Sequence, residues 1–205
     1  MSFFYLYCLN SSYKIEILKK IIANFLLNLL GWKVKVEGDL ENLDRCVLVV
    51  APHTSNTDFI LGVLTYWKLK KRLKVIIKDT HTKAFYGSLI KANGAIGIDR
   101  SKKGDLVAKV SDLFKKESFS LVITPEGSRS YAEKWRLGFY HMALEAKVPI
   151  VLVSGDYKHK LIKIGHTFSV EELQIRTLES VLEEIETYFK LVTPKHPKLY
   201  NPKIY

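Results

Sequence analysis

The sequence has few cysteines, a deficit of acidic residues and no long apolar run, and each shortage narrows the possible classes of protein. Only two of its 205 residues are cysteines, Cys8 and Cys46, so we expect no disulfide framework and a free thiol in a reducing compartment. The longest uncharged apolar run, residues 21–32, is shorter than the roughly 20 residues that a bilayer span needs. The opening residues do not resemble a signal peptide, and no internal repeat is found.

The charge is strongly unbalanced. Asp and Glu number 21 against 32 Lys and Arg, which gives a formal net charge of +11. This excess favours an anionic partner, either nucleic acid, a membrane surface or a phosphorylated substrate, although a solvated basic surface without function is the alternative. The densest basic patch, residues 68–78, carries no nucleic-acid recognition motif, zinc site or aromatic platform, so no nucleic-acid partner is expected.

Apolar residues at helical spacing predict an amphipathic helix over residues 14–30. Its wide apolar face beside lysines fits a helix that lies in a membrane interface, with the aromatic residues at the start of the chain as anchors. Packing of that face on the protein core is the alternative. We divide the chain into a membrane-contacting segment (1–31), a main domain (32–193) and an extended tail (194–205).

Short apolar runs alternate with helical patterns through the main domain. This alternation predicts an α/β fold, with a largely parallel mixed sheet flanked by helices and the N-terminal amphipathic helix added. In open sheets of this kind, ligands collect outside the carboxyl ends of the strands. The clearest runs of the buried-strand type are residues 46–51, 75–77, 119–124 and 148–153.

A histidine and an aspartate follow the first of these runs, in Pro52-His-Thr-Ser-Asn-Thr-Asp58. The spacing places His53 in a turn and Asp58 in the first turn of a helix capped by Asn56 or Thr57, where the carboxylate can hold the imidazole. A neutral histidine with one ring nitrogen on a carboxylate can accept a proton with the other. The pair is a base that supplies no nucleophile of its own.

Two arginine-bearing turns also follow expected strands. Arg100 lies at a strand-to-helix junction, which favours anions, although a surface ion pair is the alternative. The turn Pro125-Glu-Gly-Ser-Arg-Ser130 combines an irregular backbone with a carboxylate, a hydroxyl and a bidentate phosphate donor; an ordinary loop is the alternative. Because both turns fall at the sheet edge expected for His53, the three motifs predict one site.

Other chemistries lack their motifs in this sequence. The absence of a G-x-S-x-G elbow disfavours a serine hydrolase, which must supply its own activated hydroxyl. Neither H-E-x-x-H, H-x-x-E-H nor a Cys/His set is present, so no catalytic metal is expected.

Four ordered blocks lie within residues 40–165: His53-Thr-Ser-Asn-Thr-Asp58, Gly94-Ala-Ile-Gly-Ile-Asp-Arg100, Pro125-Glu-Gly-Ser-Arg-Ser130 and Val148-Pro-Ile-Val151. They resemble the glycerolipid acyltransferase family, of the bacterial 1-acylglycerol-3-phosphate acyltransferase type. Their order and spacing are far more specific than any one block. Pro52, Gly97 and Ser128 depart from the family pattern, which often has Asn, a bulkier apolar residue and Thr.

The resemblance implies an O-acyltransferase of phospholipid synthesis. It would move a fatty acyl group from acyl-CoA or acyl-carrier protein to the free hydroxyl of a lysophospholipid, with no cofactor, as a peripheral protein on an anionic membrane at its cytoplasmic face. An amino-acid-derived lysolipid acceptor, or a non-catalytic basic lipid-binding domain, is the alternative. The implied residues are His53 as base, Asp58 to orient it, Arg100, Glu126, Gly127, Ser128 and Arg129 for the acceptor phosphate, and Pro149 for the acyl chain.

Overall fold

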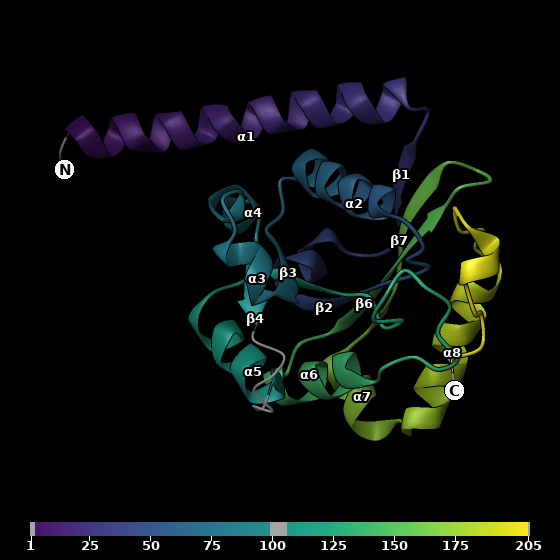
Figure 1. The fold of residues 1–205 in the computed structure, drawn as a ribbon. Coiled ribbons are helices and arrows are strands. Elements are labelled where there is room, and N and C mark those ends of the chain that lie inside the picture. The colour runs from purple at the N-terminus through teal and green to yellow at the C-terminus, as the bar shows by residue number, and fades with distance from the viewer. Residues whose placement is uncertain (1–2, 99–105, 205) are drawn as a thin grey trace.

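Helices cover both faces of a central sheet, and a long N-terminal helix lies across one side of the molecule (Figure 1). The computed structural model describes residues 3–98 and 106–204, with the backbone alone for residues 3–12, 78 and 98. The strands are β1 Lys33–Val36, β2 Cys46–Val50, β3 Leu73–Lys78, β4 Ala95–Ile98, β5 Ser120–Ile123, β6 Ile150–Asp156 and β7 Leu161–Phe168. The helices are α1 Phe3–Leu29, α2 Asn56–Leu69, α3 Asp79–Lys83, α4 Gly87–Ala92, α5 Leu106–Lys116, α6 Gly138–Ala146, α7 Val170–Ile175 and α8 Leu178–Lys190, with 3-10 turns at Leu40–Asp44 and Pro197–Leu199.

Within the described ranges, seven strands form one sheet in the order β1-β7-β6-β2-β5-β3-β4. All neighbouring pairs are parallel except β6 and β7, which are joined by a short turn and run antiparallel. This confirms the predicted α/β fold with a largely parallel mixed sheet flanked by helices. Strand β2 lies near the centre, so the residues that follow it emerge in the middle of the carboxyl edge.

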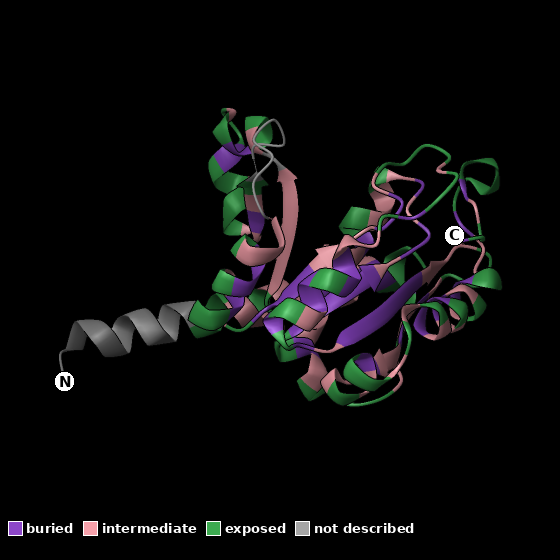
Figure 2. Ribbon diagram, turned by 90° about the horizontal axis from the view of Figure 1, so that it is seen from below, coloured by how far each residue is buried: buried purple, intermediate pink, exposed green. Residues whose placement is uncertain are grey.

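The sheet separates two apolar cores, because alternate residues of a strand point to opposite faces. Val47 and Val49 of β2 pack with α5, α6 and α8, whereas Cys46 and Leu48 pack with α1 and α2. All four side chains are buried, and Figure 2 shows the central strands buried between the helices. The continuous apolar run of β2 is explained by this burial on both faces.

Helix α1 is longer than predicted, and its wide apolar face is not the one that packs on the protein. The narrow side carrying Ala23 and Leu27 is buried against α2, while Ile21, Phe25 and Leu29 point outward with 59%, 64% and 69% of their surfaces exposed. None of the helices in the described part of the chain combines the length and hydropathy needed to cross a membrane.

The sequence pattern predicts a helix over residues 84–91, but in the structure α4 begins only at Gly87, after the separate short helix α3, and glycines let α3 pack closely on α4 and β4. A Cβ at Gly87 would lie 2.2 Å from the Thr82 carbonyl oxygen, and a Cβ at Gly97 would lie 2.1 Å from Thr82 Oγ1. Thr82 is itself buried. Its side chain therefore occupies the space that a side chain at position 97 would need.

Candidate active site

His53 lies between the buried end of β2 and the start of α2, where the sequence predicts it. The Nδ1 of its ring is 3.2 Å from Oδ2 of Asp58, and the two side chains are 19% and 8% exposed. With Nδ1 held by a carboxylate, Nε2 is the nitrogen that can accept a proton. The structure thus brings together the two residues of the His-x4-Asp motif.

Asp58 is fixed by four hydrogen-bond donors, and this makes it more than a partner of the histidine. Its Oδ2 accepts the backbone N–H groups of Thr54 and Ser55 at 2.9 and 2.8 Å, and its Oδ1 accepts the hydroxyl of Tyr157. Ser55, rather than the predicted Asn56 or Thr57, is the N-cap of α2 and forms a capping box with Asp58. One carboxylate therefore caps the helix, closes the turn and holds the imidazole of His53.

The environment keeps Asp58 ionised. Burial by itself raises the pKa of a carboxyl group, but the hydrogen bonds from His53, Tyr157 and the Ser55 N–H reverse the effect and lower the pKa of Asp58 below its ordinary value. Burial together with the Asp58 carboxylate raises the pKa of Tyr157, so its hydroxyl stays protonated and remains a donor. Sequence reasoning missed Tyr157, which lies 99 residues away in the turn after β6 and belongs to no motif.

Glu126 also holds the turn that carries His53, through a hydrogen bond to its backbone. Its carboxylate oxygens accept the backbone N–H of His53 at 2.9 and 3.1 Å, and only 7% of the residue is exposed. Burial raises its pKa to about 7, against a smaller lowering by the His53 N–H. The carboxylate therefore binds the backbone of the turn, whereas the resemblance implies that it binds the acceptor phosphate.

The rest of the Pro125–Ser130 turn lies beside the first turn of α2. Arg129 donates from Nη1 to the side-chain oxygen of Asn56, while the Ser128 hydroxyl stays within its own turn against the carbonyl of Ser130. Gly127 has φ +72°, and Arg136 lies where a Cβ would be, so a side chain is excluded there. The sheet edge therefore joins Arg129 to the His53 corner as predicted.

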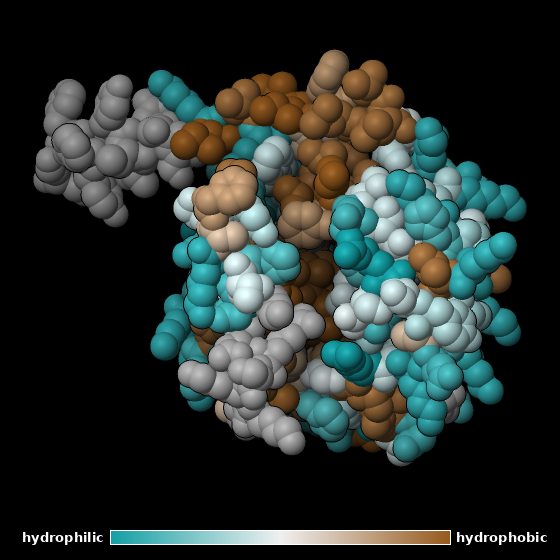
Figure 3. Space-filling view, in the orientation of Figure 1, coloured by the Kyte–Doolittle hydropathy of each residue, from teal (hydrophilic) through white to brown (hydrophobic). Residues whose placement is uncertain are grey.

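A cavity of about 610 Å³ opens between α2, α3 and this turn. Figure 3 shows it as a hollow with an apolar floor between more polar walls, below the apolar surface over α1 and α2. His53, Asp58 and Arg129 lie at its polar end. Its apolar lining runs along the inner side of α2 and the sheet and includes Leu48, Val50, Leu73, Val75, Ile77, Val122, Val153, Ile162 and Ile164.

Of the remaining predicted site residues, one is not described by the structure and one lies elsewhere. Arg100 lies outside the described residues. Pro149 precedes β6 at the amino edge of the sheet, where its carbonyl accepts the N–H of Val47, and it is not part of the lining of the cavity. Among the residues that the structure describes, no group of three or more His, Cys, Asp or Glu side chains is arranged to hold a metal ion.

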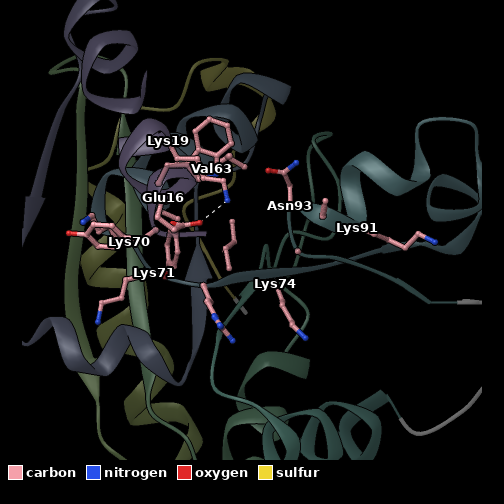
Figure 4. Close-up of a pocket in the computed structure, with 15 residues that line it drawn as sticks. Glu16, Lys19, Val63, Lys70, Lys71, Lys74, Lys91 and Asn93 are labelled. Atoms are coloured by element: carbon pink, nitrogen blue, oxygen red, sulfur yellow. Dashed lines mark hydrogen bonds and ion pairs between the residues drawn. The ribbon is translucent and has the colours of Figure 1, made fainter. Parts of the chain in front are cut away.

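The densest basic patch of the sequence lies at the opposite edge of the sheet, around a second cavity of about 490 Å³ (Figure 4). Three of its lysines already have carboxylate partners: Lys19 with Glu16 at 2.9 Å, Lys71 with Asp44 at 2.8 Å, and Lys74 with Glu117. Figure 4 shows Lys91 pointing away from the cavity. Much of this positive charge is therefore neutralised locally and remote from His53.

Comparison with known proteins places the chain in a family. The acyltransferase family model matches residues 33–154, more than half of the sequence, and the chain belongs to this family. It is 31% identical over 138 residues to a 1-acyl-sn-glycerol-3-phosphate acyltransferase of Saccharomyces cerevisiae, covering 61% of this chain and 43% of the yeast protein. A protein of the same name from Haemophilus influenzae is 24% identical over 145 residues, covering 67% and 59%.

A solved structure supports the fold. The crystal structure of the 1-acyl-sn-glycerophosphate acyltransferase PlsC from Thermotoga maritima superposes with a TM-score of 0.58 at 17% identity, covering 86% of this chain and 77% of that one. At this identity the likeness concerns the fold alone. The chain spans less than two thirds of the length of the curated relatives it matches.

The raised pKa of Glu126 gives a pH-dependent stability. Because burial raises this pKa from 4.5 to about 7, the folded state resists ionisation, and the free energy of unfolding falls as pH rises through that window. We expect Glu126→Gln, which keeps an acceptor for the His53 N–H, to gain up to about 3 kcal/mol relative to the wild type between pH 4.5 and 7. Urea unfolding at a series of pH values measures this difference. Glu133→Gln, at an exposed glutamate, is the control. If the difference in free energy of unfolding between Glu126→Gln and the wild type does not change with pH, the raised pKa of Glu126 is refuted.

Proposed function

We propose that the protein is an O-acyltransferase that moves a fatty acyl group from acyl-CoA or acyl-carrier protein to the free hydroxyl of a 1-acylglycerol-3-phosphate-like lysophospholipid. The observation that carries the proposal is the histidine held on a buried, ionised aspartate at the polar end of an apolar cavity. In the described ranges, no Ser or Cys side chain is hydrogen-bonded to His53. The nucleophile is then the hydroxyl of the acceptor.

The chemistry needs only a base and two substrates held in place. Nε2 of His53 removes the proton of the acceptor hydroxyl as its oxygen attacks the thioester carbonyl carbon. The C–S bond of the resulting tetrahedral intermediate then breaks, and the imidazolium returns the proton to the departing thiolate. Asp58 stabilises the imidazolium, since its carboxylate is ionised and bound to Nδ1.

The cavity fits a fatty chain better than a polar substrate. Its aliphatic floor between α2 and the sheet offers dispersion contacts and no hydrogen-bonding pattern, while the polar groups gather near His53. Arg129 at that end supplies a guanidinium, which is suited to a phosphate. The names of the relatives favour a glycerol phosphate acceptor over an amino-acid-derived one, and they support the phosphate role of the Arg129 turn.

An anionic membrane surface is the proposed partner. Helix α1, with its outward apolar face, packs on α2, which itself exposes Phe59 and Ile60, and Phe59 also lines the cavity. Exposed apolar patches of this kind on a cationic protein suit an interface with anionic lipid. A lysophospholipid could then pass from the membrane into the cavity without crossing water, at a cytoplasmic, peripheral location.

The membrane proposal is tested by removing outward apolar side chains from α1. The double variant Ile21→Ser, Phe25→Ser leaves the buried Ala23 and Leu27 in place, so the fold should persist. We expect its partition onto phosphatidylglycerol-containing liposomes to fall roughly a hundredfold, measured by co-sedimentation. The matched control, Ile175→Ser with Leu191→Ser, removes two side chains that are 82% and 86% exposed elsewhere. Equal losses in both variants would contradict a specific α1 contact.

The catalytic proposal is tested with His53→Ala. Loss of a general base lowers kcat by roughly 10²–10⁴-fold, so product should nearly vanish in an assay of labelled acyl-CoA and acyl-carrier protein against a panel of lysolipids. His159→Ala is the control, because His159 also pairs with an aspartate, Asp156 at 2.8 Å, but is exposed and away from the cavity. If His53→Ala is about as active as the control, His53 is not the general base.

A further inference from the structure

The C-terminal segment from Thr193 to Ile204 folds back over the active-site corner. Its residues form hydrogen bonds at three successive points of this corner: the Thr193 carbonyl accepts the N–H of Tyr157 at 2.9 Å, the His196 N–H donates to Thr54 Oγ1 at 3.2 Å, and Lys195 Nζ donates to Thr57 Oγ1 at 2.7 Å. The sequence predicts an extended tail over residues 194–205. In the structure, this part of the chain lies beside the corner that holds His53 and Asp58.

The segment is held there by its far end. Tyr200 and Ile204 are buried in the core, at 9% and 0% exposure, and the carbonyl of Ile204 accepts the N–H of Trp135 at 3.0 Å. Asn201 adds a bond from Nδ2 to the carbonyl of Glu133 at 2.8 Å. The position of Lys195 is therefore set by the fold rather than by a loose chain end.

Lys195 and Arg129 meet at neighbouring residues of the first turn of α2. Lys195 is bound to the hydroxyl of Thr57 and Arg129 to the side-chain oxygen of Asn56, so both cations rest on neutral acceptors. Neither has a carboxylate partner in the parts of the chain that the structure describes. This distinguishes them from the lysines of the second cavity, several of which are already neutralised.

The carboxylate of Asp58 does not neutralise these two cations. Asp58 lies in the same helical turn, but its oxygens are occupied by His53, Tyr157 and backbone N–H groups on the inner side. The N-terminal end of α2 adds the positive end of a helix dipole. Two cations without carboxylate partners therefore bind neighbouring residues at the start of α2, the helix that also carries Asp58.

We propose that Lys195 and Arg129 together bind the phosphomonoester of the acceptor, with the C-terminal segment supplying the second cation. The inference rests on the proposed function and deepens it. A phosphomonoester carries about −1.5 to −2 charges at neutral pH, so two cations match it better than they match a single carboxylate or a zwitterionic headgroup. The site thereby selects a lysophosphatidate-type acceptor over an amino-acid-derived one.

The test compares acceptors that differ only in the phosphate. Steady-state kinetics with 1-acylglycerol 3-phosphate and with neutral 1-acylglycerol, in mixed micelles, are measured for the full-length wild type and Lys195→Ala. We expect Lys195→Ala to raise KM for the phosphate acceptor about tenfold with little change in kcat, and to leave the neutral acceptor unaffected. Lys195→Arg should restore most of the affinity. The control is Lys198→Ala, an exposed lysine of the same segment, and a KM for Lys195→Ala equal to that of the control overturns the inference.

A binding experiment separates this inference from the catalytic one. Chemical-shift changes on titration with sn-glycerol 3-phosphate are followed in wild type, Lys195→Ala and Lys198→Ala, without any acyl donor. One outcome is that glycerol 3-phosphate binds more weakly to Lys195→Ala but not to Lys198→Ala, while the wild type acylates no acceptor. That outcome upholds the anion site and refutes the proposed function. The opposite outcome is a Lys195→Ala variant that still transfers acyl groups, with the same preference for the phosphate acceptor and the same affinity for glycerol 3-phosphate as the wild type. That outcome refutes the site and upholds the function.

Discussion

The carboxylate of Asp58 is the constraint on which the rest of the site depends. It accepts two backbone N–H groups, a tyrosine hydroxyl and the Nδ1 of His53 within one buried corner. The same hydrogen bonds that shape the turn also keep the group ionised, because each donor favours the charged form. Loss of this charge would therefore disturb the start of α2 and the orientation of the base together.

Two carboxyl groups flank the histidine, and their environments push their pKa values apart. Asp58 is surrounded by donors and its pKa is lowered, whereas Glu126 is buried with one backbone donor and its pKa rises to about 7. Such separation is the usual way in which neighbouring acids take different roles. In the proposed mechanism Asp58 provides the charge that balances an imidazolium, and Glu126 holds the backbone of the turn without adding a full second charge near neutral pH.

The parallel sheet explains why distant segments meet at this corner. Strands β2 and β5 are direct neighbours, so the turns that follow them, with His53 and Arg129, emerge side by side. Strand β6 lies on the other flank of β2 and is followed by the turn that carries Tyr157. The cavity beneath α2 then connects this polar corner with a lining of apolar side chains.

The sequence was sufficient for the parts of the fold and site that are local. The apolar run at 46–51 predicted the buried strand, and the His-x4-Asp spacing predicted the pairing, because a turn and one helical turn fix that geometry. Tyr157 and Lys195 could not be predicted, since their contacts cross 99 and 138 residues and depend on how the last strands and the C-terminal segment pack. The cap at Ser55 was missed because three neighbouring polar residues compete for one position.

The tautomer of His53 tests the central claim most directly. Long-range ¹H–¹⁵N correlation spectra at a pH where the imidazole is neutral distinguish the two ring nitrogens, and the resonances are assigned by their loss in His53→Ala. A base oriented by Asp58 must carry its proton on Nδ1 and leave Nε2 bare. A proton on Nε2, with Nδ1 bare, would contradict the account, since the nitrogen needed to deprotonate an acceptor would already be occupied.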